Sequence, residues 1–324
     1  MEATKHYSDL DTCHAFMMTI KWPDGIVKCP RCSSENIGHI TSRRLFQCKA
    51  KSCRKQFSVK FGTIFEDSPL GLDKWMVAIW SITNAKNGIS SCELARAVGV
   101  TQKSAWHMLH RVRFALKTQS FDRMTGEVES DETYVGGLAN NMHLSRRNKG
   151  QRGTGGSGKT IVHGLLERGT KDRASKVKAK VVPNVKGKTL LPVIRESVEA
   201  GSHVYTDDLN SYKALSSDYI HQIVDHAKAY VVGRVHTNGL ENFWNLLKRC
   251  IGGTYVSVDA QHLERYVDEQ VYRFNERMGT DATRFAGAMQ GVNGRRLMYK
   301  DLISANPPEG CISSDGGENV GLAN

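Results

Sequence analysis

The sequence has no long apolar run. No stretch approaches 18 consecutive apolar residues, the minimum for a membrane span, and the best candidate, Trp75–Ile82, is interrupted by Ser81. The first sixteen residues are polar and charged, whereas a secretion signal needs an apolar core there. We therefore expect a cytoplasmic protein without a membrane partner.

Acidic residues are in the minority. The chain has 33 of them against 45 Lys and Arg, which gives a net charge of +12 over 324 residues. This balance disfavours acidic-tail and halophilic proteins and favours a polyanionic partner. The length indicates about two domains with small modules attached, and 40% hydrophobic residues are enough for a sizeable core.

An intracellular chain is not expected to form a disulfide framework from its eight cysteines. Cys29 and Cys32 form one close pair, and Cys48 and Cys53 follow fifteen residues later as a second. Two such pairs supply the four thiolates of a tetrahedral zinc site, so we expect one structural Zn²⁺ in a ribbon spanning 26–62. The alternative, a redox or chance CxxC, does not explain the second pair. The other four are interpreted as structural or surface thiols: Cys13, Cys92, Cys250 and Cys311.

The ribbon also holds most of the charge. Residues 26–60 carry nine Lys or Arg and one acid, Glu35, which is +8 of the total. A small basic module of this kind is typical of binding to the phosphates of DNA; the alternative is a solvated surface that only aids solubility. The candidate DNA-binding residues here are Arg43, Arg44, Lys49, Lys51, Arg54 and Lys55.

Two short helices are expected after the ribbon. Ser90 and Glu93 predict the start of the first, Gly99 its end, and Thr101 the cap of the second. This pattern is typical of a helix-turn-helix, although a plain helical hairpin has the same signature. In the second helix Lys103, His107 and Arg111 would lie largely off the apolar stripe and reach DNA, with Gln102 and Arg113 beside them.

Residues 153–160 match the P-loop pattern GxxxxGK[ST]. A true P-loop needs a buried strand before the glycines and a helix after them. Here a basic stretch precedes and a strand-like run, 161–166, follows, so we expect no bound nucleotide. Residues 140–160 instead predict a basic loop that binds DNA through Arg146, Arg147, Lys149 and Arg152.

Acids gather in a strand-like stretch, 126–135, where alternation places Glu129 and Asp131 on one face. Strands at 161–167 and 177–183, a helix at 188–200, and a strand ending at Asp207 and Asp208 are expected to follow. A helix over 238–251 would then carry Glu241, Asn245 and Lys248 on a common face. This order is the ribonuclease-H-like topology, in which carboxylates hold two Mg²⁺ or Mn²⁺ ions. The residues alone do not exclude Glu132 or Asp208 as ligands.

Several ordered motifs resemble the DDE transposases of bacterial insertion sequences, in the zinc-ribbon (fifteen-ninety-five insertion-sequence, ISXO-type) group. The matching stretches include CPRC at 29–32, GEVESDETYVGG at 126–137, YTDD at 205–208 and HTNGLENFW at 236–244. The resemblance implies that Asp131, Asp207 and Glu241 are the catalytic acids. An asparagine can occupy the third position in this group, and Asn238 and Asn242 flank Glu241. Glu241 is favoured because a carboxylate binds Mg²⁺ better and because Lys248, which could hold a phosphate, shares its face.

The resemblance further implies a bacterial, nucleoid-associated protein that binds terminal inverted repeats and target DNA as a homodimer or larger assembly. The alternatives are a DNA-binding regulator with an inactive domain and a P-loop ATPase. We thus expect an α/β multidomain chain with a mixed sheet. Its expected parts are an N-terminal helical segment (1–25), the zinc ribbon (26–62), a helix-turn-helix-like region (70–118), a ribonuclease-H-like catalytic domain (124–298) and a disordered tail (304–324).

Overall fold

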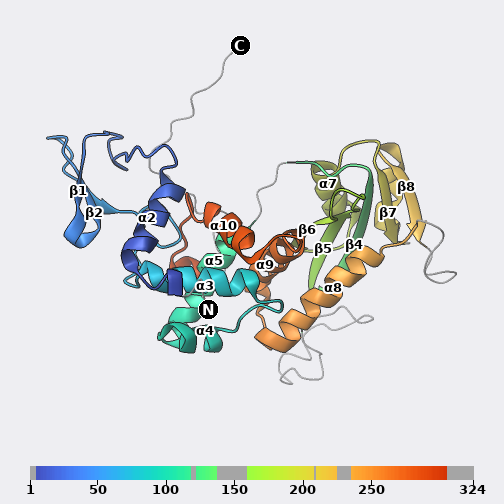
Figure 1. The fold of residues 1–324 in the computed structure, drawn as a ribbon. Coiled ribbons are helices and arrows are strands. Elements are labelled where there is room, and N and C mark those ends of the chain that lie inside the picture. The colour runs from blue at the N-terminus through green and yellow to red at the C-terminus, as the bar shows by residue number, and fades with distance from the viewer. Residues whose placement is uncertain (1–4, 118–121, 137–158, 208, 225–234, 305–324) are drawn as a thin grey trace, which may run out of the picture. The chain divides into compact units, whose positions relative to one another are not determined.

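The computed structural model describes residues 5–117, 122–136, 159–207, 209–224 and 235–304 (Figure 1). The chain divides into two compact units. The first comprises Met1–Ala85, Ile89–Leu116 and Thr280–Asn324, and the second comprises Lys86–Gly88 and Lys117–Gly279. The P-loop-like glycines, nearly all of the expected basic loop and the tail from residue 305 lie outside the described residues.

A five-stranded mixed sheet forms the centre of the second unit (Figure 1). Its order is β6-β5-β4-β7-β8, with β4 antiparallel to β5, β5 antiparallel to β6, and β4, β7 and β8 parallel. The bounds are β4 (Glu127–Val135), β5 (Thr160–Glu167), β6 (Lys176–Val182), β7 (His203–Asp207) and β8 (Ile220–Val224).

Helices cover both faces of this sheet. On one face, α8 (Asn238–Cys250) and α9 (Leu263–Asn275) pack onto β5 and β6 through an apolar cluster that includes Phe243 and Val162. On the other face, α7 (Gly187–Ser197) and the 3-10 segment η3 (Asn210–Ser217) surround Val128. Alternating side chains along β4 and β5 supply both cores, which is the pattern of a sheet buried on two sides.

The spacing of apolar residues explains why α8 lies flat on the sheet. Leu240, Phe243, Trp244 and Leu247 recur at intervals of three and four, and each is at most 4% exposed. Glu241 and Lys248 lie along one margin of this apolar stripe and are exposed. A short π-helical turn, η4 (Ile251–Tyr255), follows, and the 3-10 turn η5 (Ala260–His262) leads into α9.

The first unit combines a small sheet with helices. The antiparallel strands β1 (Ile37–Ile40), β2 (Leu45–Cys48) and β3 (Gln56–Ser58) form the ribbon, with the 3-10 turn η1 (Thr41–Arg43) between the first two. The helix α2 (Leu10–Lys21) begins at Asp9, whose carboxylate accepts the Thr12 amide at 2.8 Å. His14 of α2 stacks on His39 and Phe46 of the ribbon, with ring centroids 5.8 and 5.9 Å away.

The expected pair of helices is observed as α4 (Ser91–Val98) and α5 (Gln102–Leu116), which follow α3 (Leu72–Asn84). Ser90 and Glu93 form a complete capping box, and Gly99 ends α4 in the left-handed conformation at φ 65°. Among the described residues, no helix is long and apolar enough to cross a lipid bilayer.

Residues 280–298 lie in the first unit, although the sequence indicated that the catalytic domain extends to residue 298. The reason is packing: Phe285 of α10 (Asp281–Gln290) contacts the rings of Tyr7, Phe16 and Trp80. Beyond α10, the Ile64 amide bonds to the carbonyl of Val292 at 3.0 Å. The short α11 (Tyr299–Ile303) ends the described chain.

Candidate active site and nucleic-acid interface

Two aspartates meet on neighbouring parallel strands. Glu127, Val128 and Glu129 of β4 pair with His203, Val204 and Tyr205 of β7, and the same offset places Asp131 beside Asp207 at the end of β7. The backbone pairing between β4 and β7 ends at Glu129 and Tyr205. Asp131 and Asp207 therefore lie just beyond the last paired residues of the two strands. Carboxylate oxygens of Asp131, Glu132 and Asp207 all lie within 4.8 Å of one another.

These carboxyl groups are half-buried and repel one another. Burial raises the pKa of Asp131 to about 6, an effect opposed by its hydrogen bond from Trp244 and reinforced by Asp207. Burial likewise raises the pKa of Glu132 to about 8, against the hydrogen bond from Tyr212. A divalent cation between the carboxylates would relieve this repulsion, and oxygen ligands of this kind suit Mg²⁺ or Mn²⁺. The chemistry of the donor set therefore fits such an ion.

Glu241 lies apart from this set of three. It stands in the first turn of α8, is exposed, and is near enough to raise the pKa of Asp131. Trp244, one turn further along α8, donates its indole N–H to Asp131 Oδ2 at 2.9 Å. That bond ties the buried face of α8 to β4, and Glu241 lies at the exposed margin of that face. Lys248, a further turn along, is exposed.

The sequence did not single out several residues that hold these acids in place. Tyr212 of η3 donates its hydroxyl to Glu132 Oε1 and lies 3.3 Å from Ser130 Oγ. Trp244 lies on the helix expected over 238–251, but its contact with Asp131 was not expected. The buried Glu129 and the partly buried Arg168 and His236 form a cluster beside the start of α8. The alternation of side chains along the expected strand already placed Glu129 on the same face as Asp131. The sequence therefore offered a reason to consider Glu129 as part of the site. Asp208 lies outside the described residues.

Gly164 of β5 makes room for the Trp244 ring. A Cβ atom at this position would lie 2.6 Å from Trp244 Cη2 and 3.1 Å from Leu240 Cδ2. We expect Gly164→Ala to lower the free energy of unfolding by about 1–3 kcal/mol through overpacking. The added methyl group should also displace the Trp244 ring, which donates a hydrogen bond to Asp131. Urea denaturation would measure the change in the free energy of unfolding. Gly253→Ala is the control, because nothing lies within 4 Å of its Cβ position, and an equal loss there would contradict the prediction.

The four ribbon cysteines converge. Their Sγ atoms all lie within 4.8 Å of one another, with Cys29 3.6 Å from Cys53 and Cys32 3.6 Å from Cys48. Disulfide sulfurs would be about 2.0 Å apart, whereas a tetrahedron with Zn–S bonds of about 2.3 Å has edges of about 3.8 Å. Each pair is followed by a residue in the left-handed region, Ser33 at φ 55° and Arg54 at φ 52°. The cysteines therefore fit one Zn²⁺.

Most of the candidate DNA-binding residues of the ribbon are on its surface. Arg43, Lys49, Lys51 and Arg54 are exposed, and Lys55 is partly exposed. Arg44 is paired with Asp11, its Nε 2.5 Å from Oδ1. The residues expected in the 140–160 loop, Arg146, Arg147, Lys149 and Arg152, lie outside the described residues.

In the second helix of the α4–α5 pair, the structure differs from expectation. Lys103 is exposed, but Arg111 is 5% exposed and Arg113 1%. Arg111 donates its Nε–H to the carbonyl of Leu297 at 2.9 Å and lies over the Trp75 ring. His107 is partly buried, and burial, with a contribution from Arg111, lowers its pKa to about 4. Placing Arg111 on an exposed surface was wrong, because residues 291–298 cover that side of α5.

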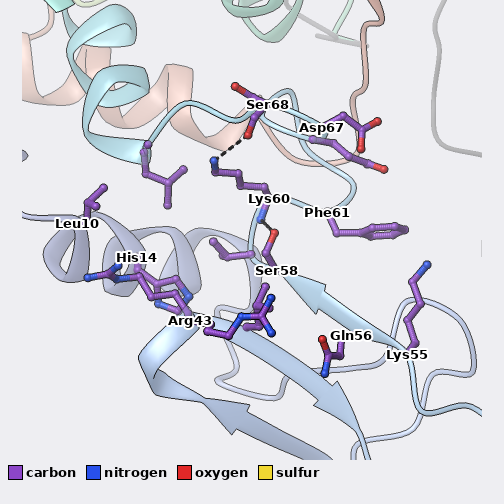
Figure 2. Close-up of a pocket in the computed structure, with 16 residues that line it drawn as sticks. Leu10, His14, Arg43, Lys55, Gln56, Ser58, Lys60, Phe61, Asp67 and Ser68 are labelled. Atoms are coloured by element: carbon purple, nitrogen blue, oxygen red, sulfur yellow. Dashed lines mark hydrogen bonds between the residues drawn. The ribbon is translucent and has the colours of Figure 1, made fainter.

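A hollow of about 610 Å³ lies beside the ribbon (Figure 2). Arg43, Lys55 and Lys60 line it together with Glu66 and Asp67. Lys60 is turned inward and donates to the carbonyl of Ser68 at 3.1 Å, as Figure 2 shows. Because acids share the lining and Lys60 is engaged within the protein, the hollow lacks the uniform positive charge of a phosphate pocket.

Comparisons with known proteins agree with this arrangement. Residues 123–275 match the ISXO2-like transposase domain, and residues 8–56 match the transposase zinc-ribbon domain. An uncharacterized protein in the transposable element ISH50 of Halobacterium salinarum is 30% identical over 240 residues, which cover 71% of this chain and 79% of that one. An uncharacterized transposase-like protein of Haemophilus influenzae is 41% identical over 101 residues, 31% of this chain and 81% of its own. With both domains matched and the ISH50 protein aligned over most of each chain, this protein belongs to the family of ISXO2-like DDE transposases that carry a zinc ribbon.

Proposed function

We propose that this protein binds the terminal inverted repeats of an insertion sequence and catalyses metal-dependent cleavage and strand transfer of their DNA. The single observation that carries the proposal is the meeting of Asp131 and Asp207 on adjacent parallel strands, with α8 bonded to Asp131 through Trp244. The sheet order β6-β5-β4-β7-β8, with β5 antiparallel to β4, supports a ribonuclease-H-like domain.

Asp131, Asp207 and Glu241 would hold the divalent cations, and Glu132 is close enough to share in binding them. Held by these carboxylates, two such ions would supply the Lewis acidity that activates a water or a 3′-hydroxyl and stabilises the leaving oxygen. Trp244 keeps one oxygen of Asp131 in a fixed orientation. Lys248 shares the exposed side of α8 with Glu241 and would hold a DNA phosphate.

The first unit would recognise the DNA ends. The exposed Arg43, Lys49, Lys51 and Arg54 would contact phosphates from the zinc-bound ribbon, and Lys103 would do so from α5. The α4–α5 pair, with its tight turn at Gly99, supports a helix-turn-helix whose second helix enters a groove. The loop residues Arg146, Arg147, Lys149 and Arg152 belong to the same proposal, as does a homodimer that holds two ends at once.

The decisive experiment uses the DNA that flanks the gene. A labelled duplex with the inverted repeats found there is incubated with the protein and Mg²⁺ or Mn²⁺, and cleavage at the repeat boundary is measured on a denaturing gel. We expect cleavage that requires the metal, is lost with EDTA and is absent on a scrambled repeat. In the presence of a plasmid we also expect the cleaved ends to be joined to the plasmid DNA. Specific binding without any cleavage would contradict the proposal and favour a DNA-binding regulator.

A further inference from the structure

A buried carboxylate holds the N-terminus of α8. Glu129 is 1% exposed, and its Oε2 accepts the backbone N–H of Leu240 at 2.9 Å. Leu240 directly precedes Glu241. The first amides of a helix have no partner within the helix, so a carboxylate there both satisfies an amide and interacts favourably with the helix dipole.

Arg168 holds this carboxylate in turn. Its Nε lies 2.8 Å from Glu129 Oε1, and one of its terminal nitrogens lies 2.7 Å from the carbonyl of His236, just before α8. A second ion pair joins Arg168 to Glu127 at 3.2 Å, and its guanidinium lies 4.4 Å from the Tyr205 ring centroid. One side chain therefore links β4, the end of β5, β7 and the chain entering α8.

Gly239 is a second, independent sign of this close approach. A Cβ atom there would lie 2.8 Å from Glu129 Oε2 and 3.0 Å from Leu166 Cδ1. Glycine is otherwise unfavourable within a helix by about 0.5–1 kcal/mol relative to alanine. Its presence in the first turn of α8 is explained if the carboxylate must come this close to the backbone.

We propose that Glu129 and Arg168 form an anchor that fixes the first turn of α8 and thereby sets the position of Glu241 relative to Asp131 and Asp207. Glu129 and Asp131 lie on the same face of β4, two residues apart, so the anchor and the cation site share one rigid strand. Glu129 is thus a positioning residue rather than a catalytic one, and the inference rests on the proposed function of the acids.

The test compares three full-length variants. Glu129→Gln keeps the shape but removes the charge, and Gly239→Ala keeps both charges but displaces the carboxylate. Glu269→Gln is the matched control, since Glu269 is 0% exposed and forms a buried ion pair with Arg273 in the same unit, near the opposite end of α8. Four quantities are measured: hydrogen exchange of residues 238–247 without metal, Mn²⁺ affinity by titration calorimetry, and the kcat and the KM for cleavage.

For Glu129→Gln and Gly239→Ala we expect faster exchange at the start of α8, Mn²⁺ affinity reduced by about 10- to 100-fold, and a lower kcat at unchanged KM for DNA. Glu269→Gln should change none of these. Exchange and Mn²⁺ affinity equal to wild type in the two test variants, or equal losses in the control, would overturn the inference. A wild-type protein that fails to cleave would instead overturn the proposed function, whereas hydrogen exchange reads the anchor in either case.

Discussion

We expect Asp131→Asn and Asp207→Asn each to reduce metal-dependent cleavage by about 100- to 1,000-fold or more and to leave binding of the repeat DNA unchanged. In both variants the amide retains the shape of the side chain but loses the negative charge that would hold a cation, and at position 131 the amide oxygen can still accept the Trp244 N–H. Cleavage of the labelled repeat duplex measures the rate, and a gel-shift titration measures the binding, which we assign to the first unit.

The control for this pair is Asp172→Asn, an exposed acid in the turn between β5 and β6. It removes the same charge from the same unit away from the cluster, so we expect wild-type cleavage. A wild-type rate in either Asp131→Asn or Asp207→Asn would show that the chemistry lies elsewhere. Glu241→Gln tests the third acid, and an effect smaller than that of Glu132→Gln would move the third role to Glu132.

Replacing a zinc ligand should unfold the ribbon and remove most of the affinity for DNA. Cys48 is fully buried and Cys29 is 2% exposed, and in small zinc modules metal binding supplies about 10–16 kcal/mol of the folding free energy. Cys29→Ser or Cys48→Ser should therefore lose the bound zinc, measured by metal analysis. The same variants should weaken DNA binding by about 10- to 1,000-fold in a gel-shift titration, because the exposed Arg and Lys no longer share one surface.

Cys92→Ser provides the comparison, since Cys92 is an exposed cysteine outside the cluster. It should keep one zinc ion per chain and normal DNA affinity. The second unit should keep its structure in every cysteine variant, because its cores contain none of these thiols. Full DNA affinity in Cys29→Ser would contradict a DNA-binding role for the folded ribbon.

The spacing of residues predicted most secondary structure because each signal is local. Ser90, Glu93 and Gly99 act within one helix, and they are observed as the capping box and the left-handed end of α4. Apolar spacing in the same way placed α8 at Asn238–Cys250, close to the expected 238–251. The strand β8 was missed because its residues do not alternate between buried apolar and exposed polar side chains. Ile220 and Ile223 are 50% and 44% exposed. β8 exists through its parallel pairing with β7 at the edge of the sheet.

The candidate site was only partly accessible from the sequence. The resemblance to DDE transposases singled out Asp131 and Asp207 among the acids of the expected strands, and the register of β4 with β7 places these two side by side. Their neighbour Glu132 was one of several possibilities until the distances were known. The burial of Arg111 was unpredictable, because its partner, the carbonyl of Leu297, is 186 residues away in the chain.

The sequence alone indicated the four cysteines as zinc ligands and located the excess of positive charge in the ribbon, since these depend on residue type and short spacing, and its resemblance to a known family indicated the first two acids. Tertiary structure decided which acids share one site and which Arg and Lys side chains remain on the surface. It placed residues 280–298 in the first unit. It also decided that Glu129 and Arg168 hold α8. These outcomes depend on contacts between segments far apart in the chain, where burial and close packing outweigh the preferences of any short stretch.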